Sequence, residues 1–310
     1  MRLASERIVA EVLPEHGMTI TALAPRHGGP NVLWERSGHV PPACSRELGP
    51  TGAGSLETLH DLLVGGWFEM SPHAGLPGEL DARPTLLHGE ASRLPWQVVS
   101  EGETWVEATV GTVHGSLELR RRIELDGDSV AVRSTIHNAG SVPASIAHGE
   151  HPCFSRAVFA GGTLTLDAGE ASVLPALDPA NASLAEGDLA WPHARGRDGA
   201  LVDLSTIPAD ADGSHDHVSI RLAGPRVGVR TRDGLHVTLH VDLGSHPYLL
   251  LWRNHRAPSS PGLGTWDVFA LEPMSAPGRA IDDAVRSGCV RRLAPGERAA
   301  YDLAISVEPP

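Results

Sequence analysis

The sequence predicts an all-β fold in which residues 1–310 form one large antiparallel sandwich and a single domain. Two observations support this prediction. Short stretches in which apolar and polar residues alternate recur along the chain, as expected for strands with one buried face. Helical periodicity is confined to two short stretches, so helices should be few. No composition shift marks a domain boundary, and no internal repeat of the kind that builds a propeller is present.

The expected strands are short and are separated by turn residues such as glycine and proline. They lie at residues 8–13, 18–23, 31–35, 115–125, 129–138, 218–222, 226–232, 235–243, 248–253, 268–273 and 298–307. Two hairpins are expected, at Asp126-Gly127 and Asp233-Gly234, because Asp-Gly between alternating strands favours a tight turn.

The remaining stretches predict loops and two short helices. Residues 36–54 are rich in Gly, Pro and Ser, and residues 168–216 are rich in Ala, Asp, Gly and Pro. The second stretch is expected to form long surface loops, where a β-domain usually builds its binding sites. Ser55 is placed to cap a leucine-bearing helix that ends before Gly65. A second helix is expected around residues 280–287.

The composition excludes several classes of function. The net charge is -13, which disfavours nucleic acid and anionic membranes as partners. All 25 basic residues are arginines, and the absence of lysine excludes a P-loop and a Schiff-base mechanism. Three consecutive arginines, Arg120, Arg121 and Arg122, fall inside one expected strand. In so acidic a chain they predict a solvated strand rather than a binding patch.

The cysteines and the first residues indicate a cytoplasmic protein. Cys44, Cys153 and Cys289 are odd in number and lack a CxxC spacing, which disfavours a disulfide framework and a zinc ribbon. The first residues form no apolar leader, and no apolar run is long enough to span a membrane. The expected location is therefore a reducing compartment.

The stretch from His148 to Phe154 carries the first candidate for chemistry. Pro152 biases His151 towards extended backbone, so alternation should send His151 and Cys153 to one face and Pro152 and Phe154 to the other. Histidine titrates near neutral pH, which makes His151 a candidate general acid or base. A packed, hydrogen-bonded core histidine is the alternative.

A second candidate is Glu272, at the end of the strand expected over residues 268–273. Alternation places Val268, Ala270 and Glu272 on one face, and the small Ala270 leaves room beside the carboxylate. A strand that simply ends in water is the alternative interpretation. The pair Gly65-Gly66 is interpreted either as part of a site or only as a source of unusual backbone angles.

The histidines also raise the question of a metal. His215 and His217 should share one face of an extended segment, and His88, His148 and His151 add further imidazoles. None of the spacings matches a zinc signature such as HExxH, so no metal is expected. No GxSxG motif is present either, which disfavours a serine hydrolase.

Taken together and in this order, these motifs resemble the aldose 1-epimerase family, the galactose mutarotase-like enzymes. The resemblance runs from about residue 8 to residue 307. It rests on Gly28-Gly29, Gly-Gly-Trp-Phe-Glu at 65–69, His-Gly-Glu with Pro-Trp at 88–96, His-Pro-Cys-Phe at 151–154, Leu-Glu-Pro-Met-Ser-Ala-Pro at 271–277 and Leu-Ala-Pro-Gly-Glu at 293–297.

The resemblance implies a large antiparallel β-supersandwich and interconversion of sugar anomers without a cofactor. Matching positions make Glu272 the catalytic base and His151 the acid. The partner would be a small-molecule sugar; the oligomeric state is left open. The resemblance also implies a set of substrate-binding residues, in which His88 polarises the ring oxygen, three aromatic rings form apolar walls, and two charged residues complete the site: His88, Trp67, Trp96, Phe154, Glu69 and Arg93.

The chain departs from the family in ways that leave the sugar unidentified. It lacks an Asn-Arg-Ile segment, has Gly89-Glu90 where Gly-Gly is usual, and has Cys153 where an aromatic residue is common. Arg93 is displaced by one position from a phosphate-binding arginine of hexose-phosphate mutarotases. The roles of Glu90, Asp216 and His217 stay open. A non-catalytic carbohydrate-binding protein on the same fold and a metal-dependent isomerase or lyase are the alternative functions.

Overall fold

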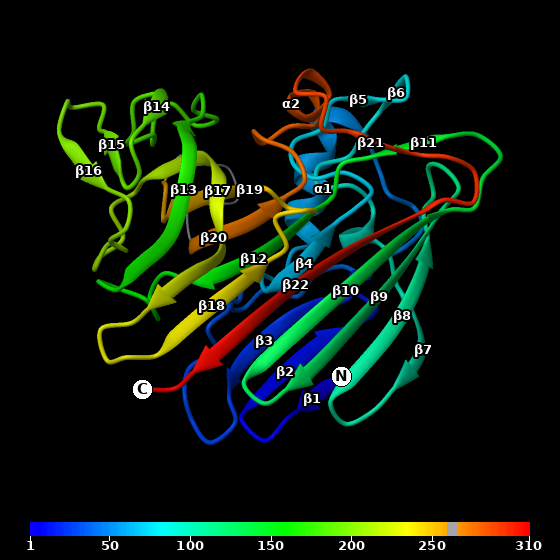
Figure 1. Cartoon of the computed structure of the whole chain (residues 1–310), viewed down its shortest axis with the longest axis horizontal. Helices are drawn as coiled ribbons and strands as arrows, with labels where there is room; N and C mark the ends of the chain where they lie inside the picture. Colours follow the sequence, from blue (N-terminus) through cyan, green and yellow to red (C-terminus); the bar gives the residue numbers. More distant parts are fainter. Residues whose placement is uncertain (259–265) are drawn as a thin grey trace.

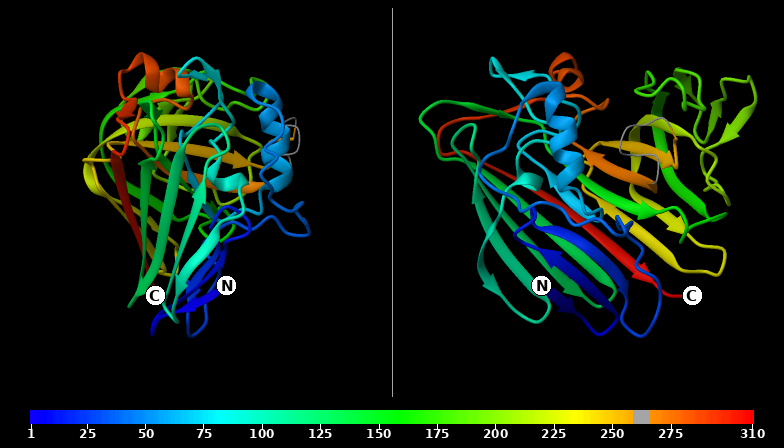
Figure 2. Two further views of the ribbon diagram at one scale, coloured as in Figure 1. Left: turned by 90° about the vertical axis from the view of Figure 1, so that its right-hand side faces the viewer. Right: turned by 180° about the vertical axis from the view of Figure 1, so that it is seen from behind.

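The chain folds around one continuous antiparallel sheet that bends into two facing layers (Figures 1 and 2). The structure, a computed structural model, describes residues 1–258 and 266–310. In spatial order, the strands of the sheet are β1 (Arg2–Ala4), β2 (Ile8–Leu13), β3 (Thr19–Pro25), β4 (Trp67–Met70), β12 (Gly149–Ser155), β20 (Asp267–Met274), β19 (Tyr248–His255), β17 (His215–Arg230), β18 (His236–Val241), β22 (Arg298–Glu308), β10 (Ser129–Asn138), β9 (Leu117–Asp126), β8 (Trp105–Gly111) and β7 (Gln97–Glu101). The predicted all-β sandwich is confirmed.

The shorter elements lie around this sheet. β13 (Thr163–Val173) pairs with β17 along most of its length, and β14 (Gly187–Leu189) pairs with β13. Three two-stranded ribbons pair β5 (Glu79–Leu80) with β6 (Arg83–Pro84), β11 (Ala144–Ile146) with β21 (Arg291–Leu293), and β15 (His193–Arg195) with β16 (Leu201–Asp203). The helices are α1 (Ser55–Leu62) and α2 (Ile281–Arg286), with single 3-10 turns at Gly52–Gly54 and Ala91–Arg93.

β17 carries the sheet from one layer to the other. Its first half pairs with β19, from His215↔Asn254 to Arg221↔Tyr248. Its second half pairs with β18, from Arg226↔His240 to Arg230↔His236. β1, β2 and β3 lie behind β22, β10 and β9 in Figure 1, and the main hydrophobic core fills the space between these layers.

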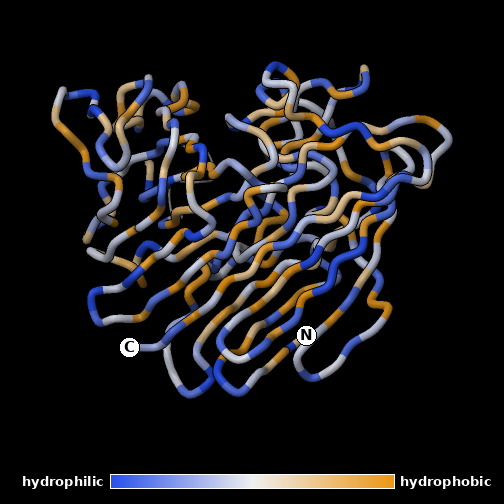
Figure 3. The backbone as a smooth tube through the Cα atoms, viewed as in Figure 1, coloured by the Kyte–Doolittle hydropathy of each residue, from blue (hydrophilic) through white to orange (hydrophobic). Residues whose placement is uncertain are grey.

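Alternation along the strands explains the core, and Figure 3 shows apolar and polar residues alternating along them. In β9 the residues from Leu117 to Leu125 at odd positions are buried, whereas Arg120 is exposed. The expected hairpins are confirmed, since Asp126 pairs with Ser129 across a turn in which Gly127 has φ +57°. The second Asp-Gly likewise joins β17 to β18.

Four expectations about the elements are wrong. Residues 31–35 form only single bridges rather than a strand, because Asn31 uses its side chain to bond the backbone of Leu23 and Thr21. The loop expected over 168–216 is interrupted, because β13 continues into it and the short strands β14, β15 and β16 follow. Ser55 opens α1 without capping it; its hydroxyl donates to the Gly52 carbonyl. The solvated interpretation fails for Arg121, as described below.

Among the described residues, none of the helices combines the length and the hydropathy needed to span a bilayer.

Candidate functional site

A cavity of about 450 Å³ lies over the strands that join the two layers. β4, β12, β20 and β19 contribute side chains that alternate out of the main core, and α1 closes one side. The lining residues that matter below are Phe68, His88, His151, Cys153, His215, His217, Trp252, Trp266, Glu272 and Arg279. The cavity thus brings together residues that are far apart in the sequence, from Trp34 to Arg279.

His151 and Glu272 meet in this cavity. His151 Nε2 lies 3.4 Å from Glu272 Oε1, and both side chains are buried. β12 and β20 are adjacent, with Cys153 opposite Ala270, so His151 and Glu272 project from neighbouring strands on the same face. The expected alternation is confirmed, because Cys153 lines the cavity while Phe154 packs into the main core.

Two neighbours fix the orientation of the His151 ring. Phe68 stacks on it, with ring centroids 4.6 Å apart and planes at 18°. His151 Nδ1 lies 3.2 Å from the Cys153 Sγ, which leaves Nε2 directed towards Glu272. Glu272 Oε2 is buried and has no hydrogen-bond partner. The pair is therefore held rigidly on the protein side and keeps one free acceptor for a ligand.

Burial drives both groups towards their neutral forms. It lowers the pKa of His151 to about 3 and raises the pKa of Glu272 well above its usual range. Direct contact between the two groups acts in the opposite direction and favours the charged pair. Burial by itself thus favours a carboxylic acid beside a neutral imidazole.

Three further histidines surround this pair. The His88 ring lies 5.0 Å from the His151 ring, and its residue has φ +57°, a left-handed conformation that non-glycine residues rarely adopt. His215 and His217 share one face of β17, with ring centroids 5.2 Å apart. The Nδ1 atoms of His88 and His215 are buried without a partner. These buried atoms, like Glu272 Oε2, lack the hydrogen-bond partners that such groups usually have.

Burial also lowers the pKa of each of these histidines. The shift is largest for His88 and His217, whose pKa lies well below the ordinary value, and the charges of neighbouring histidines and arginines add to it. His215 is shifted in the same direction. The cavity is consequently lined by neutral imidazoles, which both donate and accept hydrogen bonds.

The aromatic walls differ from those expected. The ring of Trp252, on β19, lies 5.9 Å from the His151 ring. Trp266 packs against Trp252, with ring centroids 6.4 Å apart. Trp34 contacts Trp266 at 4.9 Å. Strand alternation could have identified Phe68 as a cavity residue, because it projects from the face of β4 opposite to Trp67. For Trp252 and Trp266 no local motif distinguishes a cavity wall from core.

Five of the expected substrate-binding residues lie outside the cavity. Trp67 and Phe154 point into the main core from the opposite face of β4 and β12, and Trp96 is buried there with its Nε1 donating to the Ala91 carbonyl. Arg93 is buried beneath α1, where it donates to the carbonyls of Ser55 and Leu87. Glu69 lies in a separate ionic cluster. Only His88 of that set lines the cavity.

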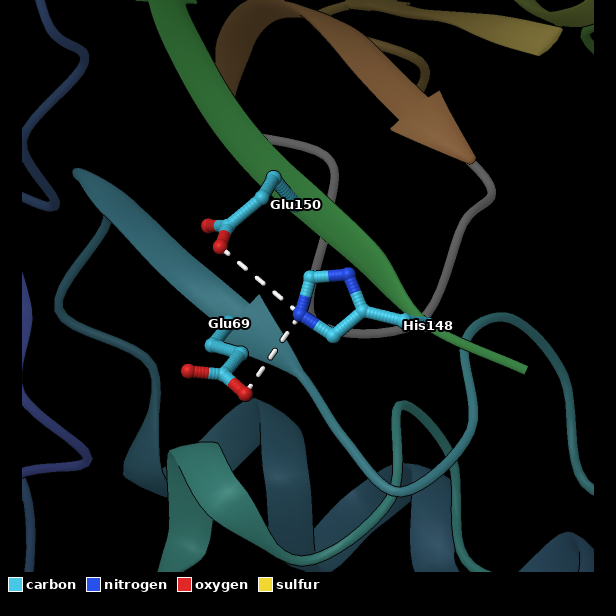
Figure 4. A group of neighbouring side chains, drawn as sticks. All are labelled: Glu69, His148 and Glu150. Carbon is cyan, nitrogen blue, oxygen red and sulfur yellow. Dashed lines mark ion pairs between the residues drawn. The ribbon is translucent and has the colours of Figure 1, made fainter. Parts of the chain in front are cut away.

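The ionic cluster lies between the two layers, on the side of β4 and β12 opposite to the cavity. Arg121 donates to Glu69 Oε2 at 3.0 Å and to both oxygens of Glu150 at 2.6 and 3.0 Å. His148 Nε2 lies 3.4 Å from Glu69 Oε1 and 3.9 Å from Glu150 Oε1 (Figure 4). Ser134 donates to Glu69. Arg121 is fully buried, which corrects the expectation of a solvated strand.

Glu69, His148 and Glu150 place three potential ligand atoms within 4.8 Å of one another. Carboxylate and imidazole are suitable metal ligands. However, the guanidinium of Arg121 already donates to both carboxylates and supplies the positive charge that a cation would bring. The donor set therefore fits an ion-pair cluster better than a metal centre.

Comparison with solved structures identifies the class of fold. The chain is similar to a galactose mutarotase related enzyme from Lactobacillus acidophilus, at 14% identity and TM-score 0.69, covering 100% of this chain and 97% of that one. A galactose mutarotase-like protein from Clostridium acetobutylicum gives 13% identity and TM-score 0.69, covering 99% and 94%. The Slr1438 protein from Synechocystis gives 18% and 0.68, covering 99% and 95%. The fold is galactose mutarotase-like.

The family is narrower than this fold. A family model described as a domain of unknown function, DUF4432, matches residues 1–307, and the chain belongs to that family. No curated protein matches the sequence. The resemblance seen in the sequence is thus confirmed at the level of the fold.

Proposed function

We propose that the cavity binds a free aldose or a simple sugar derivative and interconverts its α and β anomers by acid–base opening of the ring. The observation that carries this proposal is the contact between His151 Nε2 and Glu272 Oε1, 3.4 Å apart inside an aromatic-walled cavity. Aromatic rings suit the apolar faces of a sugar, while unpartnered polar atoms suit its hydroxyls.

The chemistry requires an acid and a base that lie close together. Opening a cyclic hemiacetal needs a proton delivered to the ring oxygen and a proton removed from the anomeric hydroxyl. Both oxygens are bonded to the anomeric carbon, so one acid and one base side by side reach both. The free aldehyde then rotates and closes on its other face, and the two groups exchange roles. His151 and Glu272 have this spacing.

The protonation state of the pair is compatible with either direction of proton transfer. The family resemblance makes Glu272 the base and His151 the acid. Burial instead leaves the proton on Glu272 in the empty cavity, with His151 as the acceptor. The two descriptions contain the same number of protons and differ by one transfer within the pair, so they belong to one titrating unit.

The test is anomer exchange measured by NMR magnetisation transfer on a panel of aldoses. The changes His151→Ala and Glu272→Gln are each expected to lower the exchange rate by about 10²- to 10⁴-fold, the usual contribution of a general acid or base. His137 and Glu118 form an exposed pair outside the cavity, 3.1 Å apart, and provide matched controls as His137→Ala and Glu118→Gln.

Exchange that survives both cavity changes would refute the acid–base assignment. If the wild-type protein binds sugars but accelerates the exchange of none of them, the cavity is instead that of a carbohydrate-binding protein without turnover.

A further inference from the structure

One arginine of the cavity has no role in the chemistry proposed above. Arg279 lies in the segment between β20 and α2 and lines the cavity. Its backbone is held on both sides, because its carbonyl accepts from Leu76 N and its N–H donates to Asp283 Oδ2. Gly75 also packs against it; a Cβ there would lie 2.3 Å from the Arg279 carbonyl oxygen. The side chain therefore starts from a fixed point at the cavity wall.

The guanidinium of Arg279 has no ion-pair partner in the described part of the chain. Its NH1 atom is buried and forms no hydrogen bond. Asp283, an acidic group close enough to affect it, is already bonded by the backbone N–H groups of Arg279 and Ala280 and by Arg286. Burial lowers the pKa of Arg279, but a guanidinium remains charged at neutral pH.

Other buried arginines of this protein show what a structural arginine looks like here. Arg121 bonds Glu69 and Glu150, Arg156 bonds Asp267, and Arg253 bonds Asp216. Each of these three has a carboxylate within the fold, as expected for a charge removed from water, whereas the buried Arg93 donates to the carbonyls of Ser55 and Leu87. Arg279 differs from these three because it lines the cavity, is only half-buried and forms no ion pair within the described residues.

Among the described residues, no acidic residue that lines the cavity forms an ion pair with Arg279, although the charges of Asp283 and Glu186 act on it. Glu272 is kept uncharged by burial, and Asp178 accepts a hydrogen bond from Asn181 at 2.6 Å. Glu57 is exposed on α1. His215 and His217 sense the charge of Arg279, which contributes to lowering the pKa of both. An anionic group on a ligand would supply the missing ion-pair partner, and His215 lines the cavity beside it.

We propose that the sugar bound in this cavity carries an anionic group, a carboxylate or a phosphate, and that Arg279 binds this group. The inference rests on the proposed function and names the class of its substrate. An arginine fork matches both kinds of oxyanion, and such charge-assisted bonds are stronger than those to a neutral hydroxyl.

The test compares charged sugars with their neutral parents. D-Glucuronate and D-galacturonate supply the carboxylate, the 6-phosphates of D-glucose and D-galactose supply the phosphate, and the two free hexoses are the neutral references. Binding is measured by ligand-observed NMR and exchange by magnetisation transfer. Wild-type protein is expected to prefer one charged class by about 10- to 100-fold. The preferred class identifies the anion.

The variants assign this preference to Arg279. Arg279→Gln should lower the charged-over-neutral ratio at least tenfold, while Arg279→Lys should retain part of it. Arg286→Gln removes a positive charge from the neighbouring α2 outside the cavity, and should keep the ratio. Circular dichroism checks that each variant is folded.

Two results would overturn the inference: a wild-type protein without preference for either anion, or a preference that Arg279→Gln leaves intact. The first does not depend on any variant folding. Charged sugars that bind through Arg279 without anomer exchange would refute the proposed function but support this inference. Neutral sugars that exchange without any charge preference would do the reverse.

Discussion

At the scale of single residues, the candidate site depends on desolvation. His151 and Glu272 project from adjacent strands into a cavity lined by aromatic and aliphatic side chains, and burial disfavours the charged form of each group. A carboxylic acid beside a neutral imidazole can donate one proton and accept another without separating charge in an apolar space. This is the combination that ring opening requires.

The pH dependence of anomer exchange follows from these shifts. Activity should fall at acid pH when His151 takes up a proton, which its pKa of about 3 delays far below the ordinary histidine range. It should fall at alkaline pH when Glu272 loses its proton, well above the ordinary carboxylate range. The measurement is kcat/KM against pH, with circular dichroism at each pH. An acid limb at the ordinary histidine pKa would show instead that His151 is hydrated and titrates like an exposed imidazole.

Part of the site could be predicted from local sequence. Pro152 and strand alternation placed His151 and Cys153 on the face that lines the cavity, and the same argument placed Glu272 beside Ala270. The aromatic walls and Arg279 could not be predicted, because they meet the site through strand pairing and loop packing between segments far apart in sequence. Trp252 differs from a core tryptophan only because its ring lines the cavity instead of packing against the main core.

At the scale of elements, β9 shows how alternation separates two kinds of charge. Arg120 is exposed beside Glu107, whereas Arg121 points between the layers and bonds two buried carboxylates. The sequence presents three adjacent arginines without distinguishing them. The residues packed against β9 decide which of the three arginines is buried. Glu69 and Glu150, which bond Arg121, come from strands of the other layer.

Neighbouring arginines of this strand therefore offer a matched comparison of stability. Arg121→Met should lower the free energy of unfolding by about 3 to 5 kcal/mol, because it leaves two buried carboxylates without their cation. Arg120→Met should change it by less than about 1 kcal/mol, as for an exposed ion pair. Denaturant unfolding of both variants measures this difference. Equal effects would mean that the cluster does not need its guanidinium.

At the scale of the whole molecule, the same cluster connects the two layers. Arg121 and Ser134 belong to one layer, and Glu69 and Glu150 belong to the other. Burial by itself would raise the pKa of Glu69, but its bonds to His148 and Arg121 lower that pKa to about 2. Contact between the layers is thus linked to the ionisation of a buried carboxylate.

Acid should weaken the fold through this group. A carboxylate whose pKa is lowered on folding contributes stability above its unfolded pKa and loses that contribution as pH falls towards the folded value. For Glu69, with a folded pKa of about 2 and an ordinary value of 4.5, the loss between pH 5 and pH 3 should be about 2 kcal/mol. Denaturant unfolding at both pH values should show a smaller loss in Glu69→Gln. An equal loss in both proteins would place the acid sensitivity elsewhere.

The path of β17 has a consequence for how the molecule opens. Because its first half pairs with β19 and its second half with β18, the two layers share this one strand. An opening that unfolds β17 removes a strand from both layers at once, so we do not expect the two layers to exchange their amide protons as independent blocks. Slow amide exchange in β18 and β19 is therefore expected to report one common opening event. A chain cut within β17 would leave two fragments, each with only part of the strand that the two layers share.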